Sequence, residues 1–199
     1  MDEKRTPGQP LPIDPSSDAP GTKTVYIGLG SNIGDRAGTL ARAIDSLNAA
    51  GVNVQRRSSL YGTEAADGPP QAWFLNAVVE AKTTLMPMQL LRALQRIERE
   101  FGRRRMVERG PRTLDLDLLI YGSSVIRKKD LEVPHPRMTE RRFVLTPLAE
   151  LAPSLRHPTL HRSIAELLAD TTDPSKVRRW QGSESEEARQ GNGRKADGN

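Results

Sequence analysis

The chain has 199 residues, enough for one domain with tails, and no cysteine, which excludes a disulfide framework and a thiolate metal site. Any metal must therefore be held by oxygen ligands or by the three histidines, while the formal net charge of +5 favours an anionic partner, either nucleic acid or a phosphorylated small molecule. No segment is apolar enough to span a membrane, and residues 1–22, with five prolines and no apolar core, are unlike a signal peptide. We expect a cytoplasmic protein.

Both ends of the chain have compositions typical of disordered segments. Residues 1–22 are rich in proline and polar residues, and residues 181–199 contain no Val, Ile, Leu, Met or aromatic residue. We therefore expect a single ordered domain, residues 23–180, between two disordered tails.

The sequence pattern of the first half of this domain predicts a strand, a helix and two more strands. Apolar residues alternate over residues 24–29, as in a strand with one buried face. A Gly-Ser-Asn-Ile-Gly turn follows, and Asp35 is placed to cap a helix that ends at Gly51. Residues 52–61 and 74–83 are predicted strands on either side of a loop rich in small residues.

The second half predicts another helix, another strand and an appendage. Pro87 suits the first turn of the helix, and Gly102 suits its end. After the arginine-rich residues 103–112, the pattern of residues 113–121 predicts a strong strand. The prolines are expected to keep residues 133–136 extended.

The appendage is predicted to hold two helices, and a capping-box pattern places the start of the second at Ser163. The order β-α-β, β-α-β and appendage predicts an α+β fold. We expect a ferredoxin-like antiparallel sheet with two helices packed on one face, plus a C-terminal helical appendage. This architecture hosts many functions, so the chemistry must be argued from particular residues.

The most informative residues are two aspartates in the strand predicted over residues 113–121. Residues two apart in a strand point to the same face, so Asp115 and Asp117 project side by side. Adjacent carboxylates repel unless a positive charge lies between them, and Mg²⁺ is bound by one or two carboxylates together with substrate phosphates. The alternative is the exposed polar face of an amphipathic strand.

Arginines preceding this strand favour the metal interpretation. Six arginines and two glutamates lie within residues 99–112. The planar guanidinium can donate two hydrogen bonds to a phosphate. Carboxylates for a metal beside cations for phosphates are the components of a phosphoryl-transfer site. A solvated basic loop is the alternative, and it explains Arg104 but not the whole set.

Three weaker signals leave their alternatives open. The turn at residues 30–34 could cradle a phosphate through backbone N–H groups, or could simply join a strand to a helix. Gln95 and Glu98 share one helix face and could hydrogen-bond a ligand, although ordinary surface residues need no explanation. His135 lies between prolines; a lone histidine is more often structural, but a rigid loop favours a phosphate contact.

Together these residues closely resemble the 6-hydroxymethyl-7,8-dihydropterin pyrophosphokinase family, over residues 24–180. The matching motifs are Tyr-Ile-Gly-Leu-Gly-Ser-Asn at 26–32, Phe-Leu-Asn-Ala-Val at 74–78, Gln-Arg-Ile-Glu at 95–98, Gly-Pro-Arg-Thr-Leu-Asp-Leu-Asp at 110–117, and Val-Pro-His at 133–135 followed by Arg141 and Phe143. The motif at 110–117 is highly specific to that family.

The resemblance implies a role for each matching residue. Asp115 and Asp117 would bind two Mg²⁺ ions that bridge ATP and the pterin hydroxymethyl group. The implied pterin contacts are Phe74 and Phe143, which sandwich the ring, together with Asn76, Thr63 and Ala66. The implied nucleotide or phosphate contacts are Gln95, Arg105, Arg112, His135 and Arg141, to which the helix face adds Glu98. Arg103 and Arg109 would act from the family's mobile catalytic loop, and Arg112 would also act in catalysis.

The resemblance also implies the reaction. Pyrophosphate would pass from ATP to 6-hydroxymethyl-7,8-dihydropterin, giving AMP and the pterin diphosphate, in tetrahydrofolate biosynthesis. We expect ATP and a reduced pterin as partners, no nucleic acid, no membrane, and a monomer. The alternative is an RNA-binding ferredoxin-like module without catalysis, which would suit the pI near 9.8. Against it, the chain has only eight aromatic residues on which bases could stack and no RNP1-like sequence.

Overall fold

Two strand–helix–strand segments and a C-terminal appendage follow one another along the chain. The computed structural model describes residues 21–63, 73–102 and 112–182. The first segments comprise β1 (Lys23–Ser31), α1 (Arg36–Ala49), β2 (Val52–Arg57), β3 (Tyr61–Thr63), β4 (Phe74–Thr83), α2 (Pro87–Glu100) and β5 (Asp115–Tyr121). The rest comprises β6 (Ile126–Lys128), β7 (Leu131–Val133), the 3-10 turn η1 (Met138–Glu140), α3 (Arg142–Leu151), α4 (Ile164–Asp170) and β8 (Val177–Arg179).

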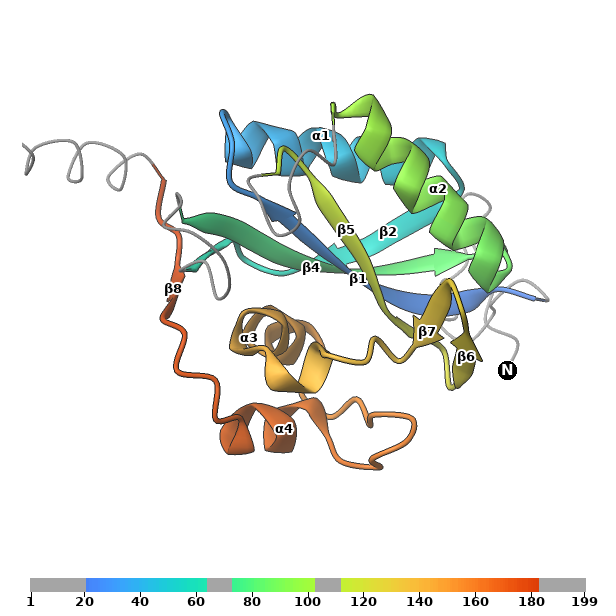
Figure 1. Ribbon diagram of the computed structural model, residues 1–199, viewed down its shortest axis with the longest axis vertical. Helices are drawn as coiled ribbons and strands as arrows, with labels where there is room; N and C mark the ends of the chain where they lie inside the picture. Colours follow the sequence, from blue (N-terminus) through green and yellow to red (C-terminus); the bar gives the residue numbers. More distant parts are fainter. Residues whose placement is uncertain (1–20, 64–72, 103–111, 183–199) are drawn as a thin grey trace, which may run out of the picture.

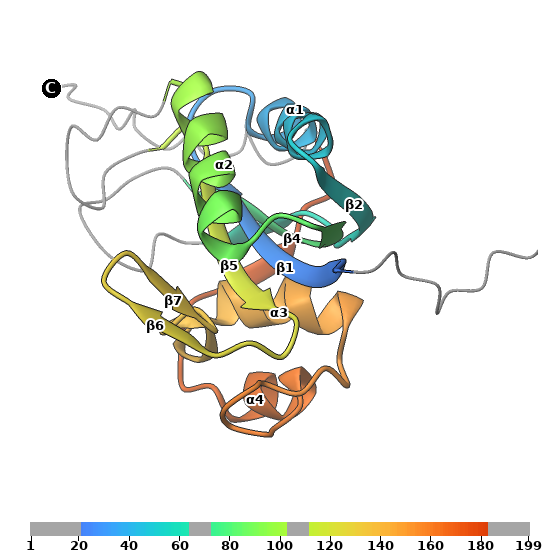
Figure 2. The ribbon, with the colours of Figure 1, turned by 90° about the vertical axis from the view of Figure 1, so that its right-hand side faces the viewer.

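An antiparallel sheet in the order β5-β1-β4-β3-β8 forms the middle of the molecule, with β2 also paired to β4. The ten-residue β4 is long enough to pair with β2 along one half and with β3 along the other. Helices α1 and α2 cover one face of the sheet (Figure 1). The predicted ferredoxin-like α+β fold is therefore confirmed, and β6 and β7 add a small hairpin beside it (Figure 2).

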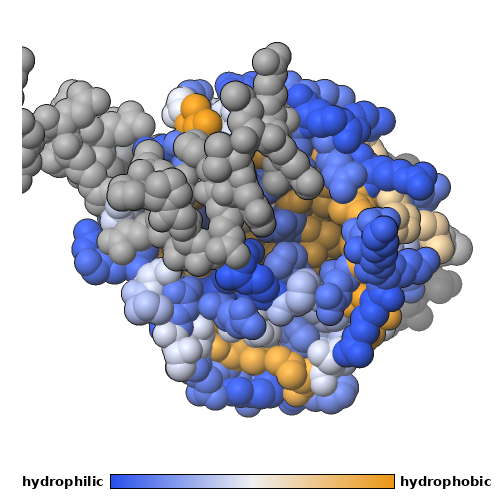
Figure 3. Space-filling view, in the orientation of Figure 1, coloured by the Kyte–Doolittle hydropathy of each residue, from blue (hydrophilic) through white to orange (hydrophobic). Residues whose placement is uncertain are grey.

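Alternation along β1 divides its side chains between the two faces. Val25 and Ile27 are fully buried in the core beneath α1 and α2, as the pattern predicted. Tyr26 belongs instead to a second core on the opposite face, where α3 packs against β4 (Figure 1). The appendage therefore covers part of the sheet face that two helices alone would leave open. Hydrophilic side chains make up most of the described surface in this orientation (Figure 3).

Several predicted boundaries are confirmed by the hydrogen bonds at the helix ends. The Asp35 carboxylate caps α1 by accepting from the Gly38 N–H at 2.9 Å. Gly51 follows α1 with a φ of +82°, a conformation that glycine adopts without the steric cost of a Cβ. The Ser163 hydroxyl caps α4 by accepting from the Glu166 N–H, and the Glu166 carboxylate accepts from the Ser163 N–H, so the predicted capping box is present.

The single strand predicted over residues 52–61 is wrong, because the chain breaks there into β2 and β3. Ser58 stays bonded to Val78 through both its N–H and its hydroxyl. The Glu150 carboxylate of α3 then accepts from the Ser59 N–H, the Ser59 hydroxyl and the Tyr61 hydroxyl. These contacts with a helix far along the chain stabilise the irregular residues between β2 and β3. Because the helix is distant in sequence, no local pattern could have indicated the break.

Residues 133–136 were expected to be extended throughout, and this is also wrong. Strand β7 ends at Val133, the Val133–Pro134 peptide is cis, and the His135 carbonyl accepts from the Met138 N–H in a turn. The prolines therefore form a corner that leads into η1.

Among the described residues, no helix is long and apolar enough to cross a membrane.

Candidate active site

A cavity of about 570 Å³ lies between the sheet and the appendage. Its lining comes from β1, β3, β4 and β5 on the sheet side, and from η1, α3 and the segment after α4 on the appendage side. The cavity brings together eight of the residues singled out from the sequence, namely Thr63, Phe74, Asn76, Arg112, Asp115, Asp117, Arg141 and Phe143.

Two glycines of β1 form the floor of this cavity. Gly28 lies between Val78 and Asp117 in the sheet register, and Gly30 lies between Asn76 and Asp115. A Cβ added at Gly30 would be 2.9 Å from the Asn76 Oδ1 atom. The absence of side chains at the centre of the sheet therefore leaves the hollow that the neighbouring strands surround.

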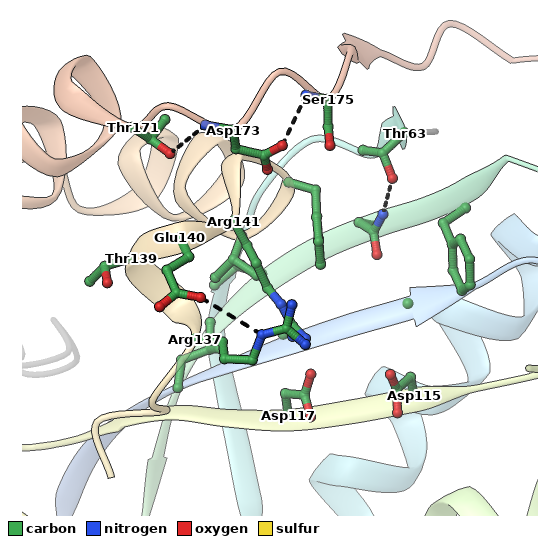
Figure 4. A pocket seen from close by; sticks show the side chains of 18 of the residues that line it. Thr63, Asp115, Asp117, Arg137, Thr139, Glu140, Arg141, Thr171, Asp173 and Ser175 are labelled. Atoms are coloured by element: carbon green, nitrogen blue, oxygen red, sulfur yellow. Dashed lines mark hydrogen bonds and ion pairs between the residues drawn. The ribbon is translucent and has the colours of Figure 1, made fainter. Parts of the chain in front are cut away.

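Asp115 and Asp117 share the cavity side of β5, as their spacing predicted. Figure 4 shows the two carboxylates side by side on the strand, facing the region of Arg137 and Arg141. The intervening Leu116 is 6% exposed and packs into the core under α2. The alternation of the strand thus gives one face to the core and the other to a pair of acidic groups.

This donor set fits Mg²⁺. Within the described ranges 21–63, 73–102 and 112–182, no cluster of three or more His, Asp or Glu side chains could hold a metal without other ligands. Two carboxylates alone suit an ion that takes its remaining oxygen ligands from substrate phosphates and water. Asp115 and Asp117 are the residues that would hold it.

Arg112 is fixed in place beside the aspartates. Its Nη1 atom lies 2.6 Å from Asp115 Oδ2. Its backbone is held in both directions by Asn32, whose side-chain Oδ1 accepts from the Arg112 N–H at 2.6 Å and whose own N–H donates to the Arg112 carbonyl at 3.1 Å. The turn after β1, interpreted from the sequence as a possible phosphate cradle, thus anchors the start of the segment that carries the aspartates.

The predicted pterin contacts on β4 lie across β1 from the aspartates of β5. Phe74 comes from β4 and Phe143 from α3, and both line the cavity. The Asn76 amide Nδ2 donates to the Thr63 hydroxyl at 2.7 Å (Figure 4). Because Asn76 is 7% and Thr63 only 1% exposed, this bond fixes the orientation of the Asn76 amide.

Positive charge faces the aspartates from the appendage. The Arg141 guanidinium lies 5.5 Å from the centroid of the Phe143 ring, in cation–π geometry. Arg137 also lines the cavity, and its Nε atom is 3.8 Å from Glu140 Oε2 (Figure 4). Arg137 and Glu140 were not predicted from the sequence, although their positions between His135 and Arg141 could have indicated them.

Other predicted contacts lie elsewhere. His135 lines a neighbouring cavity of about 210 Å³, which shares Thr139 with the larger one. Gln95 lies half-buried on α2 and is not among the described residues that line either cavity. Ala66, Arg103, Arg105 and Arg109 lie outside the described residues.

His135 is held in its neutral form. Burial, with Arg141 and Arg137 nearby, lowers its pKa to about 4. Its Nδ1 atom accepts from the Arg137 N–H at 3.2 Å, so the proton of the neutral ring is on Nε2. His135 can therefore donate a hydrogen bond to a ligand without carrying a charge.

This lowered pKa predicts a pH dependence of stability. Between about pH 6.5 and 4, the unfolded chain binds a proton at His135 that the folded protein does not, so the free energy of unfolding falls as the pH decreases through that window. Relative to His135→Gln, the protein should lose on the order of 2–3 kcal/mol between pH 7 and pH 4. Urea unfolding of both proteins across this range tests the expectation, and parallel pH curves would contradict it.

Glu98, expected from the sequence to hydrogen-bond a ligand, has a different partner. Its side chain is 5% exposed, and Oε1 accepts from the Leu116 N–H at 2.9 Å. This bond joins α2 to the β5 residue between the two aspartates. The alternative of an ordinary surface residue is wrong, because the acid is buried rather than solvated, whereas the expected ligand contact stays a prediction.

Replacing Glu98 by alanine should therefore destabilise the fold. The Leu116 N–H would lose its acceptor in the core, at a cost of about 2–3 kcal/mol. Glu98→Gln retains an acceptor oxygen and should cost about 1 kcal/mol or less. Chemical denaturation measures the free energy of unfolding of both variants. If Glu98→Ala unfolds at the wild-type midpoint, the bond to β5 does not stabilise the fold.

Comparison with known proteins assigns this site to a family. The model of the family described as 7,8-dihydro-6-hydroxymethylpterin-pyrophosphokinase matches residues 26–153. The chain is 46% identical over 156 residues to 2-amino-4-hydroxy-6-hydroxymethyldihydropteridine pyrophosphokinase of Bacillus subtilis, spanning 78% of this chain and 89% of that protein. Identity to the Aquifex aeolicus protein of the same name is 40% over 149 residues, spanning 75% and 92%.

Longer proteins match over one part of their length. The chain is 41% identical over 151 residues to the folic acid synthesis protein fol1 of Pneumocystis carinii, which is 76% of this chain but 20% of that protein. A crystal structure of wild-type Plasmodium falciparum HPPK-DHPS aligns with a TM-score of 0.58 at 15% identity, covering 74% of this chain and 43% of that one, and shows a shared fold. Since the family model matches most of the described domain, and the two bacterial relatives are covered over nearly their whole length, the chain belongs to the 7,8-dihydro-6-hydroxymethylpterin-pyrophosphokinase family.

Proposed function

We propose that the large cavity is the active site at which this chain transfers pyrophosphate from ATP to 6-hydroxymethyl-7,8-dihydropterin, with Mg²⁺ bound at Asp115 and Asp117. The family assignment supports the reaction and its place in folate biosynthesis. The observation that carries the choice of site is the arrangement around the glycine floor. Two carboxylates with Arg112 lie at one side, and two aromatic rings with a fixed amide lie at the other.

Each side of the cavity suits one substrate. A planar pterin fits between Phe74 and Phe143, with the Asn76 amide available to its polar edge. The triphosphate would lie toward Arg112 and Arg141, because guanidinium groups bind phosphate oxygens in paired hydrogen bonds. We place the pterin ring above Gly30, with its hydroxymethyl group directed between these two regions.

The reaction requires positioning and charge stabilisation rather than a protein nucleophile. The pterin hydroxyl oxygen forms a bond to the β-phosphorus as its proton is released to solvent, and the bond from that phosphorus to the oxygen of the α-phosphate breaks, releasing AMP. Bound Mg²⁺, in our proposal two ions, supplies electrostatic stabilisation of the phosphate charge. Arg112 and Arg141 hold the phosphates, and the aromatic pair holds the acceptor, so that the reacting atoms stay aligned.

Further ATP contacts follow from the resemblance. Gln95, Arg105 and His135 are proposed to contact the nucleotide, and Arg103 and Arg109 to act on the phosphates during transfer. The neutral His135 ring, with its proton on Nε2, is suited to donate to an anionic or polar ligand group. Thr63 contributes through the amide of Asn76, and we retain Ala66 as a pterin contact.

The RNA-binding alternative gains no support from the comparisons. It also conflicts with the arrangement of the sheet. Modules of that kind stack bases on the exposed sheet face. Here α3 packs over that face, against Tyr26, Val78 and Leu119.

Nucleotide analysis tests the proposed reaction. The protein is incubated with ATP, Mg²⁺ and 6-hydroxymethyl-7,8-dihydropterin, and the products are separated by anion exchange. AMP should appear in a one-to-one ratio with the pterin diphosphate. ADP with a pterin monophosphate would indicate an ordinary kinase, and no pterin-dependent turnover would reject the proposal.

A further inference from the structure

The segment after α4 forms the wall of the cavity that lies opposite the aspartates. We call residues 171–175 the strap; all five of them line the cavity, and Figure 4 shows the strap on the far side from Asp115 and Asp117. Beyond the strap the chain enters β8, where Val177 pairs with Thr63 of β3. The strap therefore connects α4 to β8, which pairs with the strand whose Thr63 orients Asn76.

Arg142 and Asp173 fasten the strap to the first turn of α3. The Asp173 carboxylate accepts from the Arg142 N–H at 2.7 Å and from the Ser175 N–H at 2.9 Å. The Arg142 guanidinium donates to the Asp173 carbonyl at 3.0 Å and to the Thr171 carbonyl at 3.1 Å. Three hydrogen bonds thus join a helix end and a loop that lie about thirty positions apart in the chain, and the fourth, from Ser175, lies within the strap.

The charges of this contact are also matched. A carboxylate that accepts from the N–H groups at the start of a helix is favoured by the helix dipole. Burial alone would raise the pKa of Asp173, but hydrogen bonds from Ser175 and Arg142 lower it. The carboxylate is therefore ionised when it meets the helix end.

The fastened helix end carries two residues of the active site. Arg141 is the residue that caps α3, and Phe143 is the second residue of the helix, so both flank Arg142 in the chain. Arg142 itself is not among the described residues that line the cavity, and its guanidinium is bonded to the strap. Because Arg141 and Phe143 are its direct neighbours in the chain, the contacts that fix the Arg142 backbone also fix the positions and side-chain directions of these two residues.

We propose that Arg142 and Asp173 are a positioning pair, which holds Arg141 against the phosphates and Phe143 against the pterin. This role rests on the proposed function, and it adds Arg142, which does not line the cavity, and Asp173, which lines it from within the strap. Loss of the pair frees the start of α3 from the strap, so that the two substrate contacts lose their fixed spacing from Phe74 and Asp115. Displacement of a positioning group by about 1 Å is enough to lower a rate by as much as 10²-fold.

The test compares Arg142→Ala, Asp173→Ala and the double variant with Arg162→Ala. Arg162 provides the matched control, because it also donates to a carboxylate, that of Asp170, and to a backbone carbonyl, that of Glu166, within the same appendage. For each protein, kcat, the KM for pterin, the KM for ATP and the melting temperature are measured. Asp173→Asn is included because it keeps the size and one acceptor oxygen of the side chain.

Each single variant is expected to lower kcat/KM for pterin by about tenfold or more, and the double variant by little more than one single change. Asp173→Asn should fall between Asp173→Ala and wild type. Losses of melting temperature should be similar to that of Arg162→Ala, so the kinetic loss is specific to the site. If Arg142→Ala and Asp173→Ala keep the kcat/KM of the control, the positioning role is rejected. Failure of wild type and Arg162→Ala to form AMP would instead reject the proposed function.

Discussion

Asp115→Asn and Asp117→Asn should each lower kcat by on the order of 10²–10³-fold. Both side chains lie on the cavity face of β5, two residues apart. Replacing one carboxylate removes a charged oxygen ligand for Mg²⁺ while keeping the size of the side chain. Mg²⁺ would bind more weakly to the single remaining carboxylate, so the Mg²⁺ concentration needed for half-maximal activity should rise as well.

The fold of both variants should persist. Neither aspartate is part of the apolar core, and removing one of two adjacent carboxylates relieves their mutual repulsion. Asp45→Asn, an exposed change on α1, controls for the substitution itself. Steady-state rates over a Mg²⁺ titration, with melting temperatures alongside, provide the measurement. Near-normal activity of either active-site variant at saturating Mg²⁺ would show that the metal is held elsewhere.

Gly30→Val should reduce pterin binding by about 100-fold or more, because it fills the floor of the cavity. Even the first added carbon would be 2.9 Å from the Asn76 Oδ1 atom. The Asn76 amide would have to rotate and give up its bond to Thr63, and the two further methyl groups would occupy space meant for the ring. Gly30 does not have a positive φ, so valine suits its backbone and the effect comes from lost space.

Gly28→Ala provides the graded comparison. Among the described residues, the atoms nearest to a Cβ there belong to Leu119, at an ordinary contact distance of 3.7 Å. We expect the affinity for 6-hydroxymethyl-7,8-dihydropterin to fall less than tenfold in this variant. Equilibrium titration with the pterin in the absence of ATP measures this affinity. Wild-type pterin affinity in Gly30→Val would place the ring away from the glycine floor.

The sequence was sufficient for the features that depend on local patterns. The alternation over β5 predicted both its buried leucines and its paired aspartates, and the caps at Asp35 and Ser163 were predicted from the residue types that start helices. These features follow from the chemistry of a few neighbouring residues. The ferredoxin-like arrangement of the sheet and its two helices was also predicted, because it follows from the order of two successive β-α-β segments.

The remaining features depend on partners far away in the chain. The break before β3 is held by Glu150 of α3, and β8 is a strand of only three residues that exists through its pairing with β3. No periodicity can be detected in so short a segment. Glu98 was misinterpreted for a related reason, because helical spacing shows which residues share a face but not that β5 lies against it. The strap, with Asp173, likewise gained its place only from contacts with α3.

A crystal structure of the protein with Mg²⁺, a nonhydrolysable ATP analogue and 6-hydroxymethyl-7,8-dihydropterin would test the central claim most directly. We predict the pterin ring between Phe74 and Phe143 above Gly30, and metal density in contact with both Asp115 and Asp117. The β-phosphorus should lie within about 3–3.5 Å of the pterin hydroxyl oxygen, as an in-line transfer requires. Pterin bound outside this cavity, or metal density that contacts neither aspartate, would contradict the proposed active site.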